Sequence, residues 1–159
     1  AGAISEAVDA AEGGIQSMLD DAAMAVMTLN GGSAVPLWNT WLDGLQEEAP
    51  EGEEIDVAGL KAIFAKALEE LEDMSGAKVG DKTMMDALIP ASEAVAAYTG
   101  DSADELFDAA AQAAAQGAEA TKQYVSKFGR AKSYGTKTIG TPDAGAVSMS
   151  WFFQGLARE

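Results

Sequence analysis

Residues 56–74 read DVAGLKAIFAKALEELEDM, with an apolar side chain at almost every third or fourth position. That spacing matches the 3.6-residue turn of an α-helix and gathers the apolar side chains into one stripe. The stripe consists of Val57, Leu60, Ile63, Phe64, Ala67, Leu68 and Leu71. Because such a stripe is buried against neighbouring helices, residues 56–74 predict a helix whose role is architectural.

The rest of the chain repeats this helical pattern. Alanine-rich segments with apolar residues three or four positions apart alternate with glycine-rich breaks, and no stretch shows sustained alternation with β-branched residues. We therefore expect an all-α fold of about seven helices, at 3–12, 15–29, 35–48, 56–74, 82–98, 102–127 and 143–157.

Most of the predicted connections are short. Short links favour antiparallel neighbours, so we expect an up-and-down helical bundle or barrel. The length of 159 residues suits a single domain spanning 1–159. The exception is the long connection 128–142, and long ordered connections in compact domains are often functional.

The composition excludes several classes of function. With 26 acidic and 10 basic residues the net charge is -16, which argues against nucleic-acid binding and against anionic membranes; the simplest interpretation is a solvated acidic surface. Cysteine and histidine are both absent, so thiol chemistry and the commonest general base and zinc ligand are excluded. The lack of cysteine is compatible with a cytoplasmic location, which we expect, and no apolar run reaches membrane-spanning length.

Three segments depart from plain bundle packing, and the first, residues 30–38, reads NGGSAVPLW. Gly31 and Gly32 free the backbone to turn tightly, Ser33 can cap the next helix, and Pro36 falls where a first-turn proline is tolerated. Helix amides aimed at such a loop form an anion site. The alternative is an ordinary Gly-Ser helix start.

The second segment, residues 80–91, reads GDKTMMDALIPA. Asp81 or Thr83 can cap the helix that follows. In a functional interpretation Lys82 and Thr83 reach a phosphate or a base, while the sulfur of Met84 covers a flat ring. The alternative assigns the methionines to the core.

The third segment, residues 127–146, reads KFGRAKSYGTKTIGTPDAGA. Five of the ten basic residues of the chain fall in or just before it, namely Lys122, Lys127, Arg130, Lys132 and Lys137. A flexible cationic loop suits a nucleotide or a phosphosugar, whereas the alternative is a charge-balancing loop that pairs with the acidic body.

Taken in order, the three segments resemble the nucleotide-binding L subunit, or C-terminal kinase domain, of the dihydroxyacetone kinase family. The resemblance runs from about Met18 to the C-terminus. Its most specific parts are GDKTM with DALIPA in 80–91, and GRA at 129–131 followed by TIG at 138–140 and DAGA at 143–146. The glycine loop matches more weakly, since the family often has Ser in place of Ala34 and Gly in place of Val35.

The resemblance implies an antiparallel eight-helix barrel that binds ADP or ATP among the loops at one end. It implies that the glycine loop cradles phosphates, that Thr83 and Met84 border the adenine, and that Arg130 and Asp143 help to enclose the nucleotide. Lys137 stands where the family often has Arg. The predicted cofactor-binding residues are Gly31, Gly32, Ser33, Lys82, Thr83, Met84, Arg130, Lys137, Asp143 and Gly145.

The sequence departs from the family in one respect. The family opens with a helix and an aspartate-rich loop whose carboxylates hold two magnesium ions, and that loop is missing here. We therefore expect an N-terminally incomplete domain, with the Mg²⁺ ligands supplied by a segment absent from this sequence and with no metal or catalytic residue of its own. Because phosphoryl transfer needs metal ions that bridge the phosphates, these residues alone should be inactive.

The resemblance also implies partners. The phosphoryl group would go to dihydroxyacetone or a similar short ketose held by a partner subunit or domain, with a phosphocarrier protein as donor in one branch of the family. Homo-oligomerisation is left open. The competing hypothesis is a non-catalytic helical interaction module that kept the fold and lost the metal loop.

Overall fold

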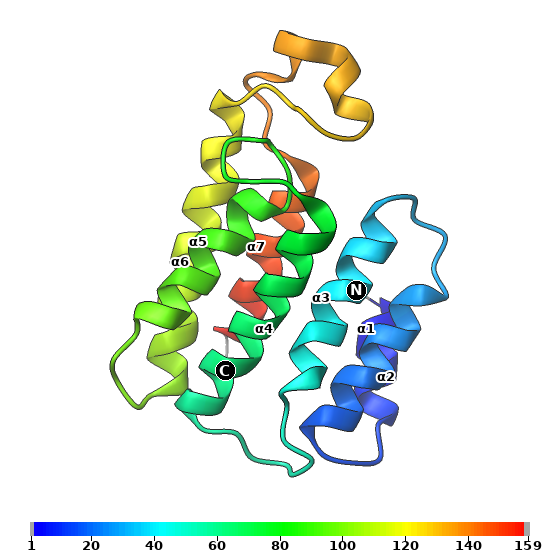
Figure 1. Cartoon of the computed structure of the whole chain (residues 1–159), viewed down its shortest axis with the longest axis vertical. Helices are drawn as coiled ribbons and strands as arrows, with labels where there is room; N and C mark the ends of the chain where they lie inside the picture. Colours follow the sequence, from blue (N-terminus) through cyan, green and yellow to red (C-terminus); the bar gives the residue numbers. More distant parts are fainter. Residues whose placement is uncertain (1, 158–159) are drawn as a thin grey trace. The chain divides into compact units, whose positions relative to one another are not determined.

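The structure is a computed structural model that describes residues 2–157, and over that range it holds seven α-helices, two 3₁₀-helices and no strand. The all-α fold predicted from the sequence is thus confirmed. The chain divides into two compact units, residues 1–75 and 76–159, each of which is described by itself (Figure 1). The single-domain organisation stays a prediction.

The first unit contains α1 (Gly2–Ala10), α2 (Ile15–Met27), α3 (Ala34–Glu47) and α4 (Val57–Ser75). Each helix packs against the next one along the chain, as short connections require of antiparallel neighbours.

The core of the first unit forms where α4 meets α3. The predicted stripe of α4 buries Leu60, Ile63, Phe64, Ala67 and Leu71. Trp41 of α3 is fully buried, and its ring centroid lies 5.7 Å from that of Phe64. The architectural helix expected over 56–74 is therefore confirmed. It could be predicted because its burial depends on a pattern that is local in sequence.

The second unit contains α5 (Met85–Ala97), α6 (Ala103–Ala120) and α7 (Ala144–Leu156), which pack against one another pairwise. Two 3₁₀-helices, η1 (Thr121–Gln123) and η2 (Arg130–Thr138), lie between α6 and α7. A Cβ at Gly117 of α6 would overlap the carbonyl oxygen of Asp86 in α5. The close approach of these two helices therefore requires glycine at this position.

Two helix boundaries in the second unit differ from the prediction. The helix expected over 102–127 ends at Ala120, because the carbonyl of Thr121 accepts hydrogen bonds from the Tyr124 amide and from the Lys82 ammonium instead of continuing the α-helical ladder. The helix expected over 82–98 begins at Met85, because Lys82 has a φ of 61° and cannot belong to a right-handed helix. The connection 128–142 also contains η2, which the sequence did not indicate.

Candidate functional site

The loop that leads into α5 is held in shape by a buried carboxylate. Asp86 is 1% exposed, and its two oxygens accept the amides of Gly80 at 2.6 Å and of Thr83 at 2.7 Å. The hydroxyl of Thr83 in turn accepts the amide of Met85 at 3.2 Å. Thr83, one of the two caps expected from the sequence, thus accepts an amide at the start of α5, whereas Asp81 binds Lys78 and Lys127. The role of Asp86 was not predicted, although an acidic residue in the first turn of a helix was a usable signal.

Lys82 lies in the same loop and points inward. The residue is 4% exposed, and its ammonium donates hydrogen bonds of 2.6 Å to the carbonyl oxygens of Thr121 and Thr141. These two carbonyls belong to the end of α6 and to the segment just before α7. The side chain therefore joins three separate parts of the second unit.

Asp143 closes the same network at the start of α7. Its amide donates to the hydroxyl of Thr121 at 2.8 Å, and its carboxylate caps α7 by accepting the amide of Ala146 at 2.9 Å. Burial raises the pKa of the Asp143 carboxyl, and the nearby Asp86 carboxylate adds to the rise, while the amides of Ala146 and Gly145 oppose it. The capping carboxylate thus stands close to a second buried acid.

Asp81 points outward from the loop and meets a lysine. Its carboxylate accepts the Lys127 ammonium at 2.6 Å and the Lys78 amide at 2.9 Å, and its carbonyl accepts the Lys127 amide at 3.1 Å. The hydrogen bond from the Lys127 ammonium is the main reason why the pKa of Asp81 is lowered. Adjacent residues thus fasten the loop on both sides, Asp81 outside and Lys82 inside.

Met84 and Gly145 meet at the contact between the loop and α7. Met84 is 5% exposed. A Cβ added to Gly145 would lie 3.0 Å from a carboxylate oxygen of Asp143 and 3.2 Å from the Cβ of Met84. Five of the predicted residues, Lys82, Thr83, Met84, Asp143 and Gly145, are therefore brought together in one cluster.

Arg130 and Lys137 lie on η2 in the same unit, and both are exposed. Within residues 2–157 their side chains, like that of Lys132, form no ion pair or hydrogen bond. Lys122 and Lys127 do pair, with Glu119 and Asp81. The charge-balancing alternative therefore describes two of the five clustered cations.

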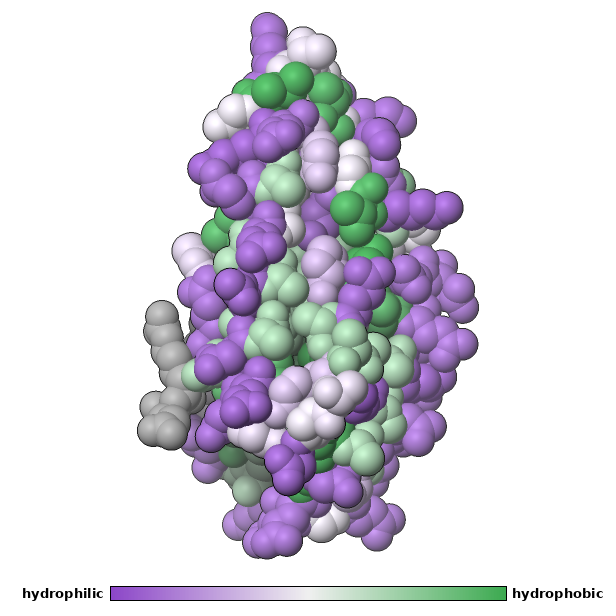
Figure 2. Space-filling model, turned by 90° about the vertical axis from the view of Figure 1, so that its left-hand side faces the viewer, coloured by the Kyte–Doolittle hydropathy of each residue, from purple (hydrophilic) through white to green (hydrophobic). Residues whose placement is uncertain are grey.

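Exposed apolar side chains accompany these cations. Phe128, Tyr134 and Ile139 are 41%, 64% and 49% exposed. In Figure 2 strongly hydrophobic and hydrophilic atoms are mixed at the upper end of the molecule, where Figure 1 draws residues 130–138. This end of the second unit therefore offers both positive charge and apolar surface.

The glycine loop lies in the first unit at the start of α3. Gly31, Gly32 and Ser33 are exposed, Gly32 has a φ of 56°, and the Ser33 hydroxyl makes no capping hydrogen bond. The first turns of α4, α6 and α7, in contrast, each have a side-chain acceptor, from Asp56, Ser102 and Asp143. The first turn of α3 therefore has amides that no capping side chain satisfies.

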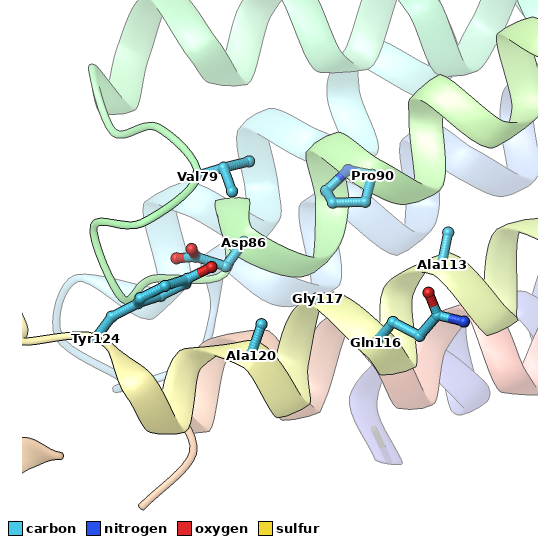
Figure 3. Close-up of a pocket in the computed structure, with 8 residues that line it drawn as sticks. All are labelled: Val79, Asp86, Pro90, Ala113, Gln116, Gly117, Ala120 and Tyr124. Atoms are coloured by element: carbon cyan, nitrogen blue, oxygen red, sulfur yellow. The ribbon is translucent and has the colours of Figure 1, made fainter. Parts of the chain in front are cut away.

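A pocket of about 270 Å³ lies between α5, α6 and the segment after η1 (Figure 3). Its walls are mostly apolar, and Asp86, Gln116 and Tyr124 supply the polar groups. The remaining lining residues are Val79, Pro90, Ala113, Gly117 and Ala120. None of the predicted site residues lines this pocket.

Two further observations concern metals and membranes. Within residues 2–157 no group of three or more acidic side chains gathers closely enough to hold a metal ion. Among the helices of this described range, none has both the length and the apolarity needed to cross a membrane.

The model of the DAK2 domain family matches residues 1–158 of the chain. The all-α fold is therefore that of a DAK2 domain, and the chain is a member of the DAK2 domain family.

Individual relatives extend this result. L-erythrulose kinase from Pectobacterium atrosepticum is 35% identical over 153 residues, which cover 92% of this chain and 25% of that kinase. The ADP-binding subunit DhaL of PEP-dependent dihydroxyacetone kinase 2 from Listeria innocua is 30% identical over 147 residues, which cover 91% of this chain and 67% of that subunit. The native crystal structure of the dihydroxyacetone kinase of C. freundii matches with a TM-score of 0.64 and 25% identity, covering 89% of this chain and 23% of that one.

The lengths of these relatives differ in an informative way. The chain spans about a quarter of the length of the erythrulose kinase and about two thirds of the Listeria subunit. A domain of this family therefore occurs both as part of a longer kinase and as a separately named subunit.

Proposed function

We propose that this chain is the ADP- or ATP-binding domain, or subunit, of a kinase that phosphorylates a short ketose. The relatives support the proposal, since their names specify dihydroxyacetone or erythrulose as substrate and ADP as the ligand of the matching subunit. The observation that carries it is the charge of Arg130 and Lys137, which have no ion-pair partner among residues 2–157 although the net charge of the chain is -16. An exposed cation without a protein partner is available for an anionic ligand.

The described residues fit a nucleotide in three respects. Gly31 and Gly32 present backbone without side chains, and the open first turn of α3 offers amides to a phosphate. Arg130 and Lys137 supply positive charge to the polyphosphate. Thr83 and Met84 lie at the entrance to α5, where we assign them to the adenine, with Asp143 and Gly145 beside them.

The reaction proposed for the whole protein is phosphoryl transfer to a ketose of three or four carbons. The ketose would be held by a partner subunit or by another domain, in the cytoplasm, with ATP or a phosphocarrier protein as the donor. Magnesium would neutralise the phosphate oxygens when bound.

Calorimetric titration with ADP, with and without Mg²⁺, tests the binding. We expect saturable binding by the parent chain and a loss of roughly ten- to a hundredfold in affinity for Arg130→Gln, because a charge-assisted hydrogen bond is removed. Lys122→Gln is the matched control: it removes the same charge from a side chain already paired with Glu119, and it should bind like the parent. Parent-like affinity of Arg130→Gln would remove Arg130 from the site.

The same titration separates the proposal from its competitor. A chain that binds neither ADP nor ATP at millimolar concentration, with or without Mg²⁺, would support the non-catalytic interaction module. Binding of ADP that is lost in Arg130→Gln and kept in Lys122→Gln would support the kinase domain.

A further inference from the structure

Lys82 is a buried cation that forms no ion pair with a carboxylate among residues 2–157, although the carboxylate of Asp143 lies near enough to interact with its charge. Burial of an ammonium is costly unless hydrogen bonds replace its hydration. Here two short bonds to the carbonyls of Thr121 and Thr141 use two of its three donors. The side chain therefore acts on the backbone of its own protein.

The two carbonyls belong to segments that also contact each other directly. The amide of Gly140 donates to the carbonyl of Lys122 at 2.7 Å, and the amide of Asp143 donates to the hydroxyl of Thr121 at 2.8 Å. Lys82 adds the loop before α5 to this pair. The ammonium thus stands where the three segments meet.

The backbone conformation of Lys82 is one that a lysine rarely adopts. Its φ of 61° makes it the one non-glycine residue with positive φ among residues 2–157. A glycine would adopt this conformation without strain, whereas a lysine persists there only when its surroundings hold it. The two bonds of the ammonium are among the interactions that hold it, together with the bonds from the amides of Gly80 and Thr83 to Asp86.

We propose that Lys82 is a positioning residue, whose ammonium fastens the end of α6 and the segment before α7 to the loop that carries Thr83 and Met84, and that it does not bind phosphate. This structural role of Lys82 is proposed for the nucleotide-free protein and does not depend on nucleotide binding. Its effect on ADP affinity rests on the function proposed above.

Competitive acetylation of the native, unaltered chain provides the first test. Each lysine is labelled with acetic anhydride and quantified by mass spectrometry, with and without ADP. We expect Lys82 to react roughly tenfold or more slowly than Lys132 in both states, since it must open locally before it reacts. A Lys82 that reacts as fast as Lys132 without ADP, and becomes protected by ADP, would overturn the proposal.

Hydrogen exchange of variants without nucleotide provides the second test. Lys82→Gly removes the ammonium and relieves the backbone, so it should fold even where Lys82→Met does not. We expect the amides of Gly140, Asp143 and Ala146 to exchange roughly ten to a hundred times faster in it, because charged hydrogen bonds are lost. Lys82→Arg should restore part of the protection and Arg130→Gln should leave it unchanged, while parent-like exchange in Lys82→Gly would refute the fastening.

Salt dependence of ADP binding then separates the two roles. The affinity lost in Lys82→Gly should be the same at low and high salt, whereas the loss in Arg130→Gln should shrink as salt rises, since exposed charges are screened. A loss in Lys82→Gly that shrinks in the same way would make Lys82 a phosphate ligand. If the parent does not bind ADP, the proposed function fails, while exchange and acetylation still decide the fastening.

Discussion

Replacing Asp86 tests how the loop before α5 is held. Asp86→Ala leaves the part-buried amides of Gly80 and Thr83 without their acceptor, and an unsatisfied amide costs about 1–3 kcal/mol when it is fully buried. Because both amides are only part-buried, we expect a loss near the lower end of about 2–6 kcal/mol in the free energy of unfolding. Alanine offsets a few tenths of a kcal/mol of this loss, since it is a better helix former than aspartate. Asp86→Asn keeps one acceptor oxygen and should lose about half as much.

Urea denaturation followed by far-UV circular dichroism measures both losses. Asp108→Ala is the control, because Asp108 is an exposed acid on α6 and its loss should change the free energy of unfolding by less than about 0.5 kcal/mol. Since small proteins are stable by only about 5–15 kcal/mol, the expected loss is easily resolved. An Asp86→Ala protein within about 0.5 kcal/mol of the parent would show that this carboxylate does not hold the loop.

Three further predictions concern the second unit. Gly117→Ala should cost about 1–3 kcal/mol in urea denaturation because its Cβ would overlap α5, whereas Gly155→Ala, with no atom within 4 Å, should stabilise by about 0.5–1 kcal/mol. Lys127→Met should raise the pKa of Asp81, which an NMR titration measures. Because folding lowers this pKa, Asp81 stabilises the protein above its unfolded pKa, and that contribution is lost as the pH falls through its folded pKa. The variant should therefore lose no more than about 1 kcal/mol in the free energy of unfolding at neutral pH, since the pair is half-exposed, and nothing in acid. The raised pKa of Asp143 gives the opposite pH dependence of stability: its contribution is complete below the unfolded pKa and is lost as the pH rises through the folded pKa. Asp143→Asn retains an acceptor for the cap but does not ionise. It should therefore abolish that loss in denaturation curves measured between acid and neutral pH.

The helices that could be predicted are those whose boundaries depend on local patterns. The stripe of α4 recurs every three or four residues, and that pattern alone determines which face is buried. The end of α6 could not be predicted in this way. It depends on Lys82, which lies 39 positions away from Thr121 in the sequence and meets it only in the fold.

The candidate site, too, could be predicted only where it depends on local sequence patterns. The segments 80–91 and 127–146 were selected from glycines, cations and capping residues, and the structure brings five of the predicted residues together in the second unit. The burial of Lys82 and the part played by Asp86 could not be derived from those patterns, because both depend on contacts between the loop and other elements. The glycine loop lies in the other unit, so its part in the site stays a proposal.

The buried ammonium at the end of α6 also bears on the helix macrodipole. α6 begins with two acidic residues, Asp104 and Glu105, in its first turn, and the carbonyl of its C-cap residue Thr121 accepts the Lys82 ammonium. Negative charge at the amino end and positive charge at the carboxyl end both interact favourably with the helix dipole, and each stabilises the helix by roughly 0.3–1 kcal/mol, or more where partly buried. α6 is therefore protected from fraying at both termini, and on heating it should be the last helix of its unit to unwind.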